Sequence, residues 1–460
     1  MDFILGMSQV RNLPPAEQVK LNKLLRIYGA HASKNEEKEK YYNGSIDVRD
    51  VNLGIALPKQ FKGLEIACEW GAKAVDVLAD RSIFDGFVDA SGAELEELTD
   101  IVNNNNLITE YSKACCDELK IGVSFATLSA DPEIGCKIRF HSAATAAAHW
   151  NGDKGRIDYG FAVIDSDDSN GFWQPTLVNF YTEDAIWVMT YANSIWTAQY
   201  NHQVMGRPLM VPMIWNATSK KPFGRSRIKR PVRTCVQGYI RTVANATIGL
   251  EFATAPQKYL MGVTDDQYDA LINQKFKQYI GNIIASTTNP ETGEKPTFGQ
   301  LQQGNISPHV EMMRILATQF SAATGLTVTD TGVVNDANPT SSDAILAQSQ
   351  TLVRMAEKLN ISNGSALQEI ALMALAIANN TTIDELDAEK RNIMAHFKNP
   401  AMPSVAVTAD AAIKIASARP SFAGTDTFLE MIGFNQADIR RIKSQERMNQ
   451  GLQVLGSLEE

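Results

Sequence analysis

Several short motifs that mark common enzyme classes are absent from this chain. It has no G-x-x-x-x-G-K-[ST] segment, so it is not itself a P-loop motor. It also has neither an H-E-x-x-H motif nor a G-x-S-x-G nucleophile elbow. Because these catalytic motifs are missing, the chain of 460 residues is predicted to be a structural protein. We expect it neither to be an enzyme nor to bind a cofactor.

Metal-ligating and disulfide-forming residues are few and widely spaced. The six histidines show no metal-ligand spacing: His31, His141, His149, His202, His309 and His396. The five cysteines are odd in number and include no C-x-x-C pair: Cys68, Cys115, Cys116, Cys136 and Cys235. Buried or indifferent thiols are therefore expected rather than disulfides or zinc ligands.

Long apolar runs are also missing. No run approaches the length of a membrane span, and residues 1–15 lack the basic start and the sustained apolar segment of a signal peptide. We expect a protein that is made and first used in a reducing cytoplasm and that has no membrane partner.

Positive charge is absent from one long segment. Residues 315–353 contain no lysine or arginine, and their only charged side chains are Asp330, Asp336 and Asp343. The net charge of the whole chain is −9, which argues against nucleic-acid binding over the whole surface but leaves local contacts open. A loop in the cation-free segment cannot hold a polyanion electrostatically.

Two helices are predicted to flank a loop in this part of the chain. The first covers residues 307–324, with Ser307 as N-cap, Pro308 in the first turn and Gly325 as its stop. Its apolar positions recur at helical spacing and predict one buried face: Val310, Met313, Ala317 and Phe320. A second helix comes next, and residues 325–340 between the two are predicted to be irregular.

The rest of the chain changes from helical to β patterns and back. Helices are predicted first, over 14–40, 62–84 and 93–120, and six β-rich runs come after them between 121 and 215. This order predicts an α+β fold in which helices precede an antiparallel meander. Further helices are predicted over 231–254, 365–379, 384–397 and 408–418. An insert at 257–306 is predicted to start as a strand and to continue as a helix over 265–284, and a helical hairpin is predicted at the C-terminal end.

One strongly basic run interrupts this pattern. Residues 220–233 contain no acid and seven basic side chains: Lys220, Lys221, Arg225, Arg227, Lys229, Arg230 and Arg233. Two interpretations stay open. The run is either a solvated or salt-bridged surface loop, or a contact for DNA or for an acidic partner surface.

A series of glycine, proline and aromatic positions surrounds the basic run. They are Gly206, Pro208, Val211 and Pro212, and then Pro222, Phe223, Gly224, Ser226 and Ile228. Gly224 allows a sharp backbone turn, and Ser226 is expected to cap the helix after it. Together with residues 41–58, 320–345 and 399–418, in this order, the series resembles the portal proteins of tailed bacteriophages.

The resemblance implies a portal-type fold built from seven parts in chain order. They are an α/β wing (1–228), a first stem helix (229–256), a clip (257–306), a second stem helix (307–324), a tunnel loop (325–340), a long helix returning to the wing (341–400) and a small C-terminal helical region of wing and crown (401–460). A helix pair with an insert at one end and a loop at the other is the geometry that such a ring requires.

The resemblance also implies function, partners and location. Portal proteins form a ring, usually dodecameric, at one capsid vertex of the virion, through which double-stranded DNA is packaged and ejected. The implied partners are further copies of the chain, transiently bound double-stranded DNA, the terminase large subunit, the major capsid and scaffolding proteins, and the head-completion adaptor. During assembly the protein would be in the host cytoplasm.

The candidate site residues form two groups. The tunnel loop would line a DNA channel with Thr329, Asp330, Thr331, Asn335, Asp336 and Asn338. The start of the first stem helix would contact DNA phosphates, capsid or scaffold through Arg225, Arg227, Lys229, Arg230 and Arg233. Other hypotheses stay open: a plain surface loop at 325–340, another oligomeric head–tail connector or scaffold-associated virion protein, and an enzyme of unknown type.

Overall fold

The computed structural model describes most of the chain. The described residues are 7–51, 63–89, 95–169, 171, 173–254, 258–261, 293, 295, 297–300, 305–333, 342–401, 405–434 and 436–456. The chain divides into two compact units, a first of Met1–Ser33, Asp76–Ser226 and Ser341–Glu460 and a second of Lys34–Val75 and Arg227–Thr340. Residues 34–75 therefore group with the segment that begins at Arg227 and not with the rest of the predicted 1–228 region.

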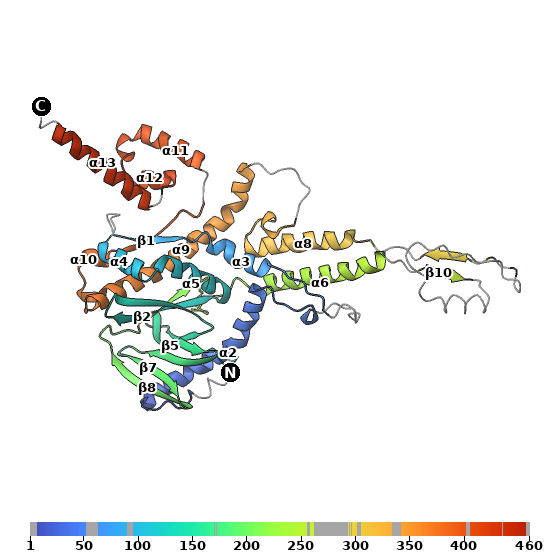
Figure 1. The fold of residues 1–460 in the computed structure, drawn as a ribbon, viewed down its shortest axis with the longest axis horizontal. Coiled ribbons are helices and arrows are strands. Elements are labelled where there is room, and N and C mark those ends of the chain that lie inside the picture. Colours follow the sequence, from blue (N-terminus) through green and yellow to red (C-terminus); the bar gives the residue numbers. More distant parts are fainter. Residues whose placement is uncertain are drawn as a thin grey trace. The chain divides into compact units, whose positions relative to one another are not determined.

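The first unit contains the antiparallel strands predicted between residues 121 and 215 (Figure 1). A five-stranded sheet has the order β4 (Ala146–Asn151), β5 (Arg156–Asp167), β6 (Gln174–Tyr181), β7 (Ala185–Ala192) and β8 (Ile195–His202). A three-stranded sheet has the order β3 (Gly135–Ser142), β2 (Val123–Asp131) and β9 (Met210–Ile214). The meander and the mixed helix-and-sheet fold are confirmed, whereas β4 has no counterpart in the prediction because its alanines lack the β-branched signal of a strand.

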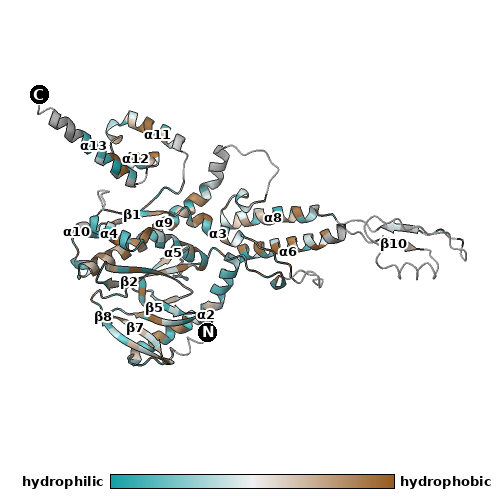
Figure 2. Ribbon diagram, in the orientation of Figure 1, coloured by the Kyte–Doolittle hydropathy of each residue, from teal (hydrophilic) through white to brown (hydrophobic). Residues whose placement is uncertain are grey.

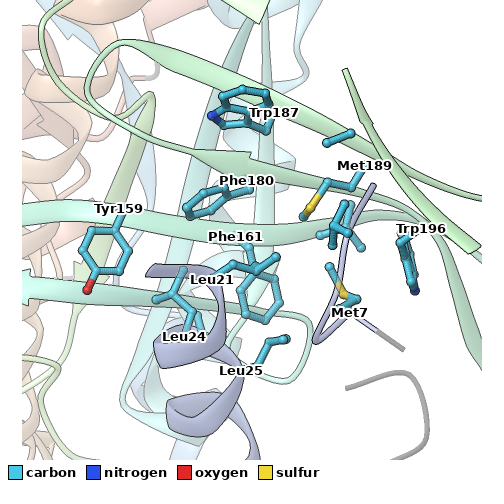
Figure 3. Packing of buried hydrophobic residues seen from close by; sticks show 14 of the residues in the cluster. Met7, Leu21, Leu24, Leu25, Tyr159, Phe161, Phe180, Trp187, Met189 and Trp196 are labelled. Atoms are coloured by element: carbon cyan, nitrogen blue, oxygen red, sulfur yellow. The ribbon is translucent and has the colours of Figure 1, made fainter. Parts of the chain in front are cut away.

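A hydrophobic core holds the first part of helix α2 (Pro15–Tyr42) against the five-stranded sheet (Figure 3). Leu21 and Leu24 of the helix are fully buried, and so are Phe161 on β5 and Phe180 on β6. Along β7, buried and partly buried side chains alternate, as expected for a strand with one face against a core.

The shorter helices of the first unit keep the predicted order. They are α4 (Glu96–Asn104), α5 (Leu107–Ile121), α10 (Ala388–Arg391), α11 (Val405–Ala418), α12 (Asp426–Ile432) and α13 (Gln436–Gly456), and α3 (Trp70–Ala79) spans the boundary between the units. The predicted helical region 93–120 is confirmed from residue 96 on, with its break at the asparagine run, where Asn106 adopts a left-handed conformation.

One pair of strands replaces the ends of two predicted helices. β1 (Phe84–Val88) pairs antiparallel with β12 (Met394–Phe397), with Phe84 opposite Phe397. The two rings also meet edge to face, with centroids 5.9 Å apart. Because these strands lie far apart in the chain, their pairing leaves no local periodicity that the sequence alone can reveal.

The long helix α9 (Ser342–Ala378) packs on strands of the first unit. In the described part of the chain it is the one helix whose window, Ser349–Ala378, is long and apolar enough to cross a membrane by length and composition. Hydrophobic stretches run along this helix (Figure 2). Many of its apolar side chains are buried in the core: Leu352, Val353, Ala356, Leu359, Leu367, Ile370, Ala374 and Leu375. Core packing accounts for the apolar composition. The long helix was predicted over 341–400, and in the structure it ends earlier, at Ala378.

The second unit contains the predicted helix pair. α6 (Arg230–Thr254) and α8 (Ser307–Thr324) lie side by side (Figure 1). Between them in the chain, beyond the end of the pair, β10 (Lys258–Met261) pairs antiparallel with β11 (Thr297–Gln300). The chain thus leaves along one helix and returns along the other, as predicted. The helix predicted inside the insert lies outside the described residues.

Candidate functional site

The helix pair approaches closely at Gly238 of α6. A Cβ at this position would lie 2.8 Å from Cδ2 of Leu316 on α8, so the missing side chain lets the two helices approach each other. Buried apolar side chains line both helices: Val236, Ile240, Ala244 and Ile248 on α6, and Leu316, Ala317 and Phe320 on α8.

The first turns of α8 are less buried than predicted. Ala317 and Phe320 lie on the buried face as expected, but Val310 is 40% exposed. Met312 and Ile315 are exposed as well, because the buried part of α8 begins only at Leu316. The predicted apolar stripe is therefore correct for the second half of the helix and wrong for Val310.

The ends of α8 are fixed by polar contacts. The N-cap is Ile306, and Ser307 is the first helical residue, whose N–H donates to Oδ1 of Asn305 at 2.9 Å. Asn305 thus makes the polar contact expected of Ser307. The predicted stop is confirmed, because Gly325 has a φ of +76° and its N–H donates to the Ser321 carbonyl at 2.8 Å.

A tight turn comes directly after α8 and includes three of the predicted tunnel-loop residues. Thr329–Thr331 form one turn of 3-10 helix. Oδ2 of Asp330 accepts hydrogen bonds from the N–H and the hydroxyl of Thr327, each at 2.8 Å. The start of the predicted irregular loop is therefore an ordered turn. The other predicted loop residues lie outside the described residues: Asn335, Asp336 and Asn338.

The indole of Trp70 contacts the end of this turn. Its Nε1–H donates to the Thr331 carbonyl at 3.1 Å, and both residues are buried. The ring stacks on Phe320 of α8 at 5.1 Å between centroids and lies 5.0 Å from the ring of Tyr239 on α6. Thr331, expected in a DNA channel, is thus only 9% exposed. Sequence reasoning missed Trp70, although a buried indole N–H generally needs an acceptor.

Arg227 is buried although it belongs to the predicted basic surface. It is 6% exposed; its Nε donates to the Ala74 carbonyl, and its Nη2 donates to the Thr324 carbonyl at 2.8 Å. Burial lowers the pKa of the guanidinium to about 10, so the group stays charged at neutral pH. Thr324 is the last residue of α8, where a cation interacts favourably with the free helix carbonyls. The expectation that Arg227 lies on the surface is therefore corrected.

The other four basic residues of the group differ in exposure. Arg225, Lys229 and Arg230 are exposed. Arg233 is partly buried and forms an ion pair with Glu37. Arg233 therefore fits the salt-bridged interpretation, whereas both interpretations stay open for the three exposed residues.

Gly224 and Ser226 of the predicted motif have separate roles in the first unit. Gly224 has a φ of +68°, and a Cβ there would lie 2.9 Å from the carbonyl oxygen of Gly122 and closer still to that of Trp215. The sharp turn expected at Gly224 is confirmed. Ser226 is not a helix cap, because its hydroxyl donates to the Lys120 carbonyl in α5 and α6 starts several residues later.

The remaining motif residues shape the sheets nearby. Gly206 has a φ of +63° in the connection to β9. Pro212 lies on β9 opposite Phe125, at the edge of the three-stranded sheet, where a residue without an N–H is tolerated. The Phe223 ring meets those of Phe125 and Trp150 edge to face, each with centroids 5.9 Å apart. Phe223 thus links a strand of each sheet.

The described residues contain no group of three or more histidine, cysteine, aspartate or glutamate side chains placed to hold a metal ion. The cysteines are free thiols. Burial raises the pKa of Cys68 and of Cys136 to about 12, so neither is a reactive thiolate at neutral pH.

Two curated relatives match most of the chain. It is 23% identical over 426 residues to the portal protein of Mycobacterium phage D29, a match that covers 89% of this chain and 85% of the relative. It is 24% identical over 422 residues to the portal protein of Mycobacterium phage L5, covering 88% of this chain and 84% of the relative. No protein-family model matches the chain.

Two solved structures have a distantly similar backbone. A chain in the neck of an empty GTA particle, computed with C6 symmetry, is 11% identical with a TM-score of 0.44 over 77% of this chain and 86% of its own length. A chain in the neck of a native GTA particle, computed with C12 symmetry, is 10% identical with a TM-score of 0.45 over 79% and 89%. The two relatives confirm the resemblance indicated by the motifs: over nearly nine tenths of its length, this chain is similar to the portal proteins of two mycobacteriophages.

Proposed function

We propose that this chain is a phage portal protein, which forms a ring at one capsid vertex and conducts double-stranded DNA during packaging and ejection. The similarity to two portal proteins over most of their length and of this chain carries the proposal. The helix pair α6 and α8 supports it, because a ring with a central channel needs an elongated element with a docking end and a channel end.

Each part of the ring corresponds to particular elements. In this proposal α6 and α8 form the stem, the strand pair β10 and β11 belongs to the clip, and residues 325–340 form the tunnel loop. The two sheets and α9 form the wing, and the helices α11 to α13 form a small C-terminal region of wing and crown.

The ring is proposed to be a homo-dodecamer with cyclic symmetry, in which each copy offers two different surfaces to its neighbours. The clip docks the terminase large subunit during packaging and the head-completion adaptor afterwards, and the wing contacts the major capsid and scaffolding proteins. The chain has no P-loop, so the motor chemistry belongs to the terminase. The protein itself is a conduit and docking hub of the virion that assembles in the host cytoplasm.

DNA must move through the ring, so the channel must bind it weakly. Each phosphate neutralised by a lysine or arginine adds a salt-dependent attraction that slows sliding. Residues 315–353 contain neither. In this proposal the exposed Thr329, with Asn335 and Asn338, makes transient contacts, while the carboxylates of Asp330 and Asp336 oppose tight binding. Thr331 supports the turn rather than touching DNA, because it is buried.

Imaging of the purified protein by negative stain, combined with native mass spectrometry, tests the proposal. A dodecameric ring with a hole wide enough for duplex DNA is the expected result. An oligomer without such a hole favours another head–tail connector or a scaffold-associated virion protein. A chain that stays monomeric at all concentrations contradicts the proposed function.

A further inference from the structure

We propose that Trp70 and Arg227 are positioning residues for the loop directly after α8. Each fastens one end of the segment 324–331 by a hydrogen bond to a buried backbone carbonyl. The inference rests on the proposed function, since it concerns how this loop is held while DNA passes through the ring.

Trp70 fastens the far end of the segment. Its indole is 4% exposed and lies against a ring on each stem helix, Phe320 on α8 and Tyr239 on α6. This packing aims the only donor of the indole at the Thr331 carbonyl, 3.1 Å away. Removal of the donor would leave a buried carbonyl without its partner, so the indole N–H contributes more than packing.

Arg227 fastens the near end. The Thr324 carbonyl belongs to the last turn of α8, where carbonyls lack a partner within the helix, and Nη2 of Arg227 supplies one at 2.8 Å. The same guanidinium donates through Nε to the Ala74 carbonyl, so its orientation is set by two bonds. Ser321 adds a third contact by donating its hydroxyl to the Leu326 carbonyl.

The two fixed ends determine the direction in which the chain leaves α8. Between them, the hydrogen bonds of the segment are those within the turn, chiefly of Thr327 with the Asp330 carboxylate, and the one from Ser321 of α8 to the Leu326 carbonyl. The bonds within the turn hold it together but do not orient its far end, at Thr331, on the helices. On the proposed function, the contacts of Trp70 and Arg227 place the loop identically in every copy of the ring, so that DNA meets one uniform constriction.

The variant Trp70→Phe separates the hydrogen bond from the packing, because phenylalanine keeps an aromatic ring against Phe320 and Tyr239. Hydrogen exchange of the assembled protein reports on the turn through the amides of Thr331 and Gly332, which donate to Val328 and Thr329. We expect these amides to exchange roughly tenfold faster in the variant. We also expect the variant to form rings but to give fewer DNA-filled particles than the wild-type protein during phage assembly.

Trp196→Phe is the matched control, because Trp196 is equally buried but lies on β8 in the first unit. It should change neither the exchange of these amides nor the yield of filled particles. If Trp70→Phe does not assemble, Arg227→Lys gives the same two measurements, since a lysine keeps the charge but lacks the two-pronged donor geometry.

Unchanged exchange at Thr331 and Gly332 in the Trp70 variant would overturn the inference. Faster exchange with an undiminished yield of filled particles would overturn the positioning role as well. A wild-type protein that forms no ring would instead contradict the proposed function, and the exchange measurement on the purified chain would still decide whether Trp70 holds the turn.

Discussion

The side-chain amide of Asn363 on α9 donates to Oε2 of Glu118 on α5 at 2.8 Å, and neither side chain is exposed to solvent. The same amide donates to the Tyr111 hydroxyl at 3.1 Å, which in turn shares a hydrogen bond of 2.6 Å with Ser82. Oε1 of Glu118 has no hydrogen-bond partner among the described residues. Burial therefore raises the pKa of Glu118 to about 8, and the carboxyl is mainly neutral at pH 7.

Glu118→Gln is expected to change how stability depends on pH. Between pH 4.5 and about 8 the folded wild-type protein binds one more proton than the unfolded chain, so its free energy of unfolding falls as pH rises. Each pH unit in this range lowers that free energy by up to about 1.4 kcal/mol. Glutamine cannot ionise, so the variant should lose this slope and be more stable than wild type at pH 8. Denaturant unfolding at several pH values measures the effect.

His141 sets the lower limit of the pH range in which the slope of stability against pH reports on Glu118 alone. Burial, and then the nearby charge of Arg139, lower its pKa from 6.5 to about 4. The folded protein thus binds fewer protons than the unfolded chain between these values, and this contribution to stability is lost as pH falls. The range from pH 6.5 to 8 therefore reports Glu118 without His141. An equal slope there in wild type and Glu118→Gln would show that the carboxyl is already ionised in the folded protein.

Local signals were sufficient for the helix pair and insufficient for the strand pair. Helix α8 has Pro308 in its first turn and Gly325 just after its end, so both limits can be read from neighbouring residues. The pairing of Phe84 with Phe397 depends on two distant segments meeting in the core, and each segment alone was predicted as the end of a helix. Tertiary contacts overrode local pattern there.

In the candidate site, too, some features could be predicted from the sequence and others could not. The basic run and the cation-free segment are properties of composition and could be read directly from the sequence. The burial of Arg227 could not, because its acceptors are carbonyls of Ala74 and Thr324, and every residue type carries such a group. The same holds for Trp70, whose acceptor is the backbone of Thr331.

Gly224→Ala should destabilise the first unit strongly. The residue has a φ of +68°, and a methyl group would collide with the backbone carbonyls of Trp215 and Gly122. Left-handed strain alone costs about 1–2 kcal/mol, and the collision adds to it. Gly206→Ala is the matched control, because φ is +63° there but a Cβ would meet nothing within 4 Å. In thermal unfolding, Gly224→Ala should lower the Tm clearly more than Gly206→Ala; equal decreases would refute the close approach.

The two glycines within α6 should respond to alanine with opposite signs. A Cβ at Gly249 would meet nothing within 4 Å, so Gly249→Ala should stabilise the helix by up to about 1 kcal/mol. At Gly238 the same methyl group would press on Leu316, and overpacking of this kind costs about 1–3 kcal/mol. Comparison of both variants by denaturant unfolding checks the close approach of α6 and α8. If Gly238→Ala is as stable as Gly249→Ala, the Leu316 side chain moves aside at no cost and the contact at Gly238 is not tight.

Asp330→Lys is expected to reduce DNA packaging for two separable reasons. It adds a cation to the loop, and it removes the acceptor for the N–H and hydroxyl of Thr327. Asp330→Ala removes the acceptor and the negative charge without adding a cation, and Asp330→Asn removes the charge while keeping a carbonyl acceptor. Packaging should decrease most for lysine and least for asparagine, as counted by DNA-filled particles. Asp336→Lys adds a cation at a second position, and undiminished packaging in both lysine variants would contradict the weak-binding channel.

Substitution of the exposed basic residues of this run should affect DNA binding, whereas substitution of the buried Arg227 should affect stability. Arg225, Lys229 and Arg230 are exposed, so replacing them with glutamine should leave the Tm within a few degrees of wild type. If they bind phosphates, DNA binding by the ring should weaken, and the slope of log affinity against log salt should shrink by about 1 for each phosphate that is no longer neutralised. Arg227→Met should instead lower the Tm, because it leaves the Ala74 and Thr324 carbonyls without their donor. Unchanged salt dependence, assembly and packaging in the triple glutamine variant would establish that the exposed residues are a solvated surface and no part of the channel.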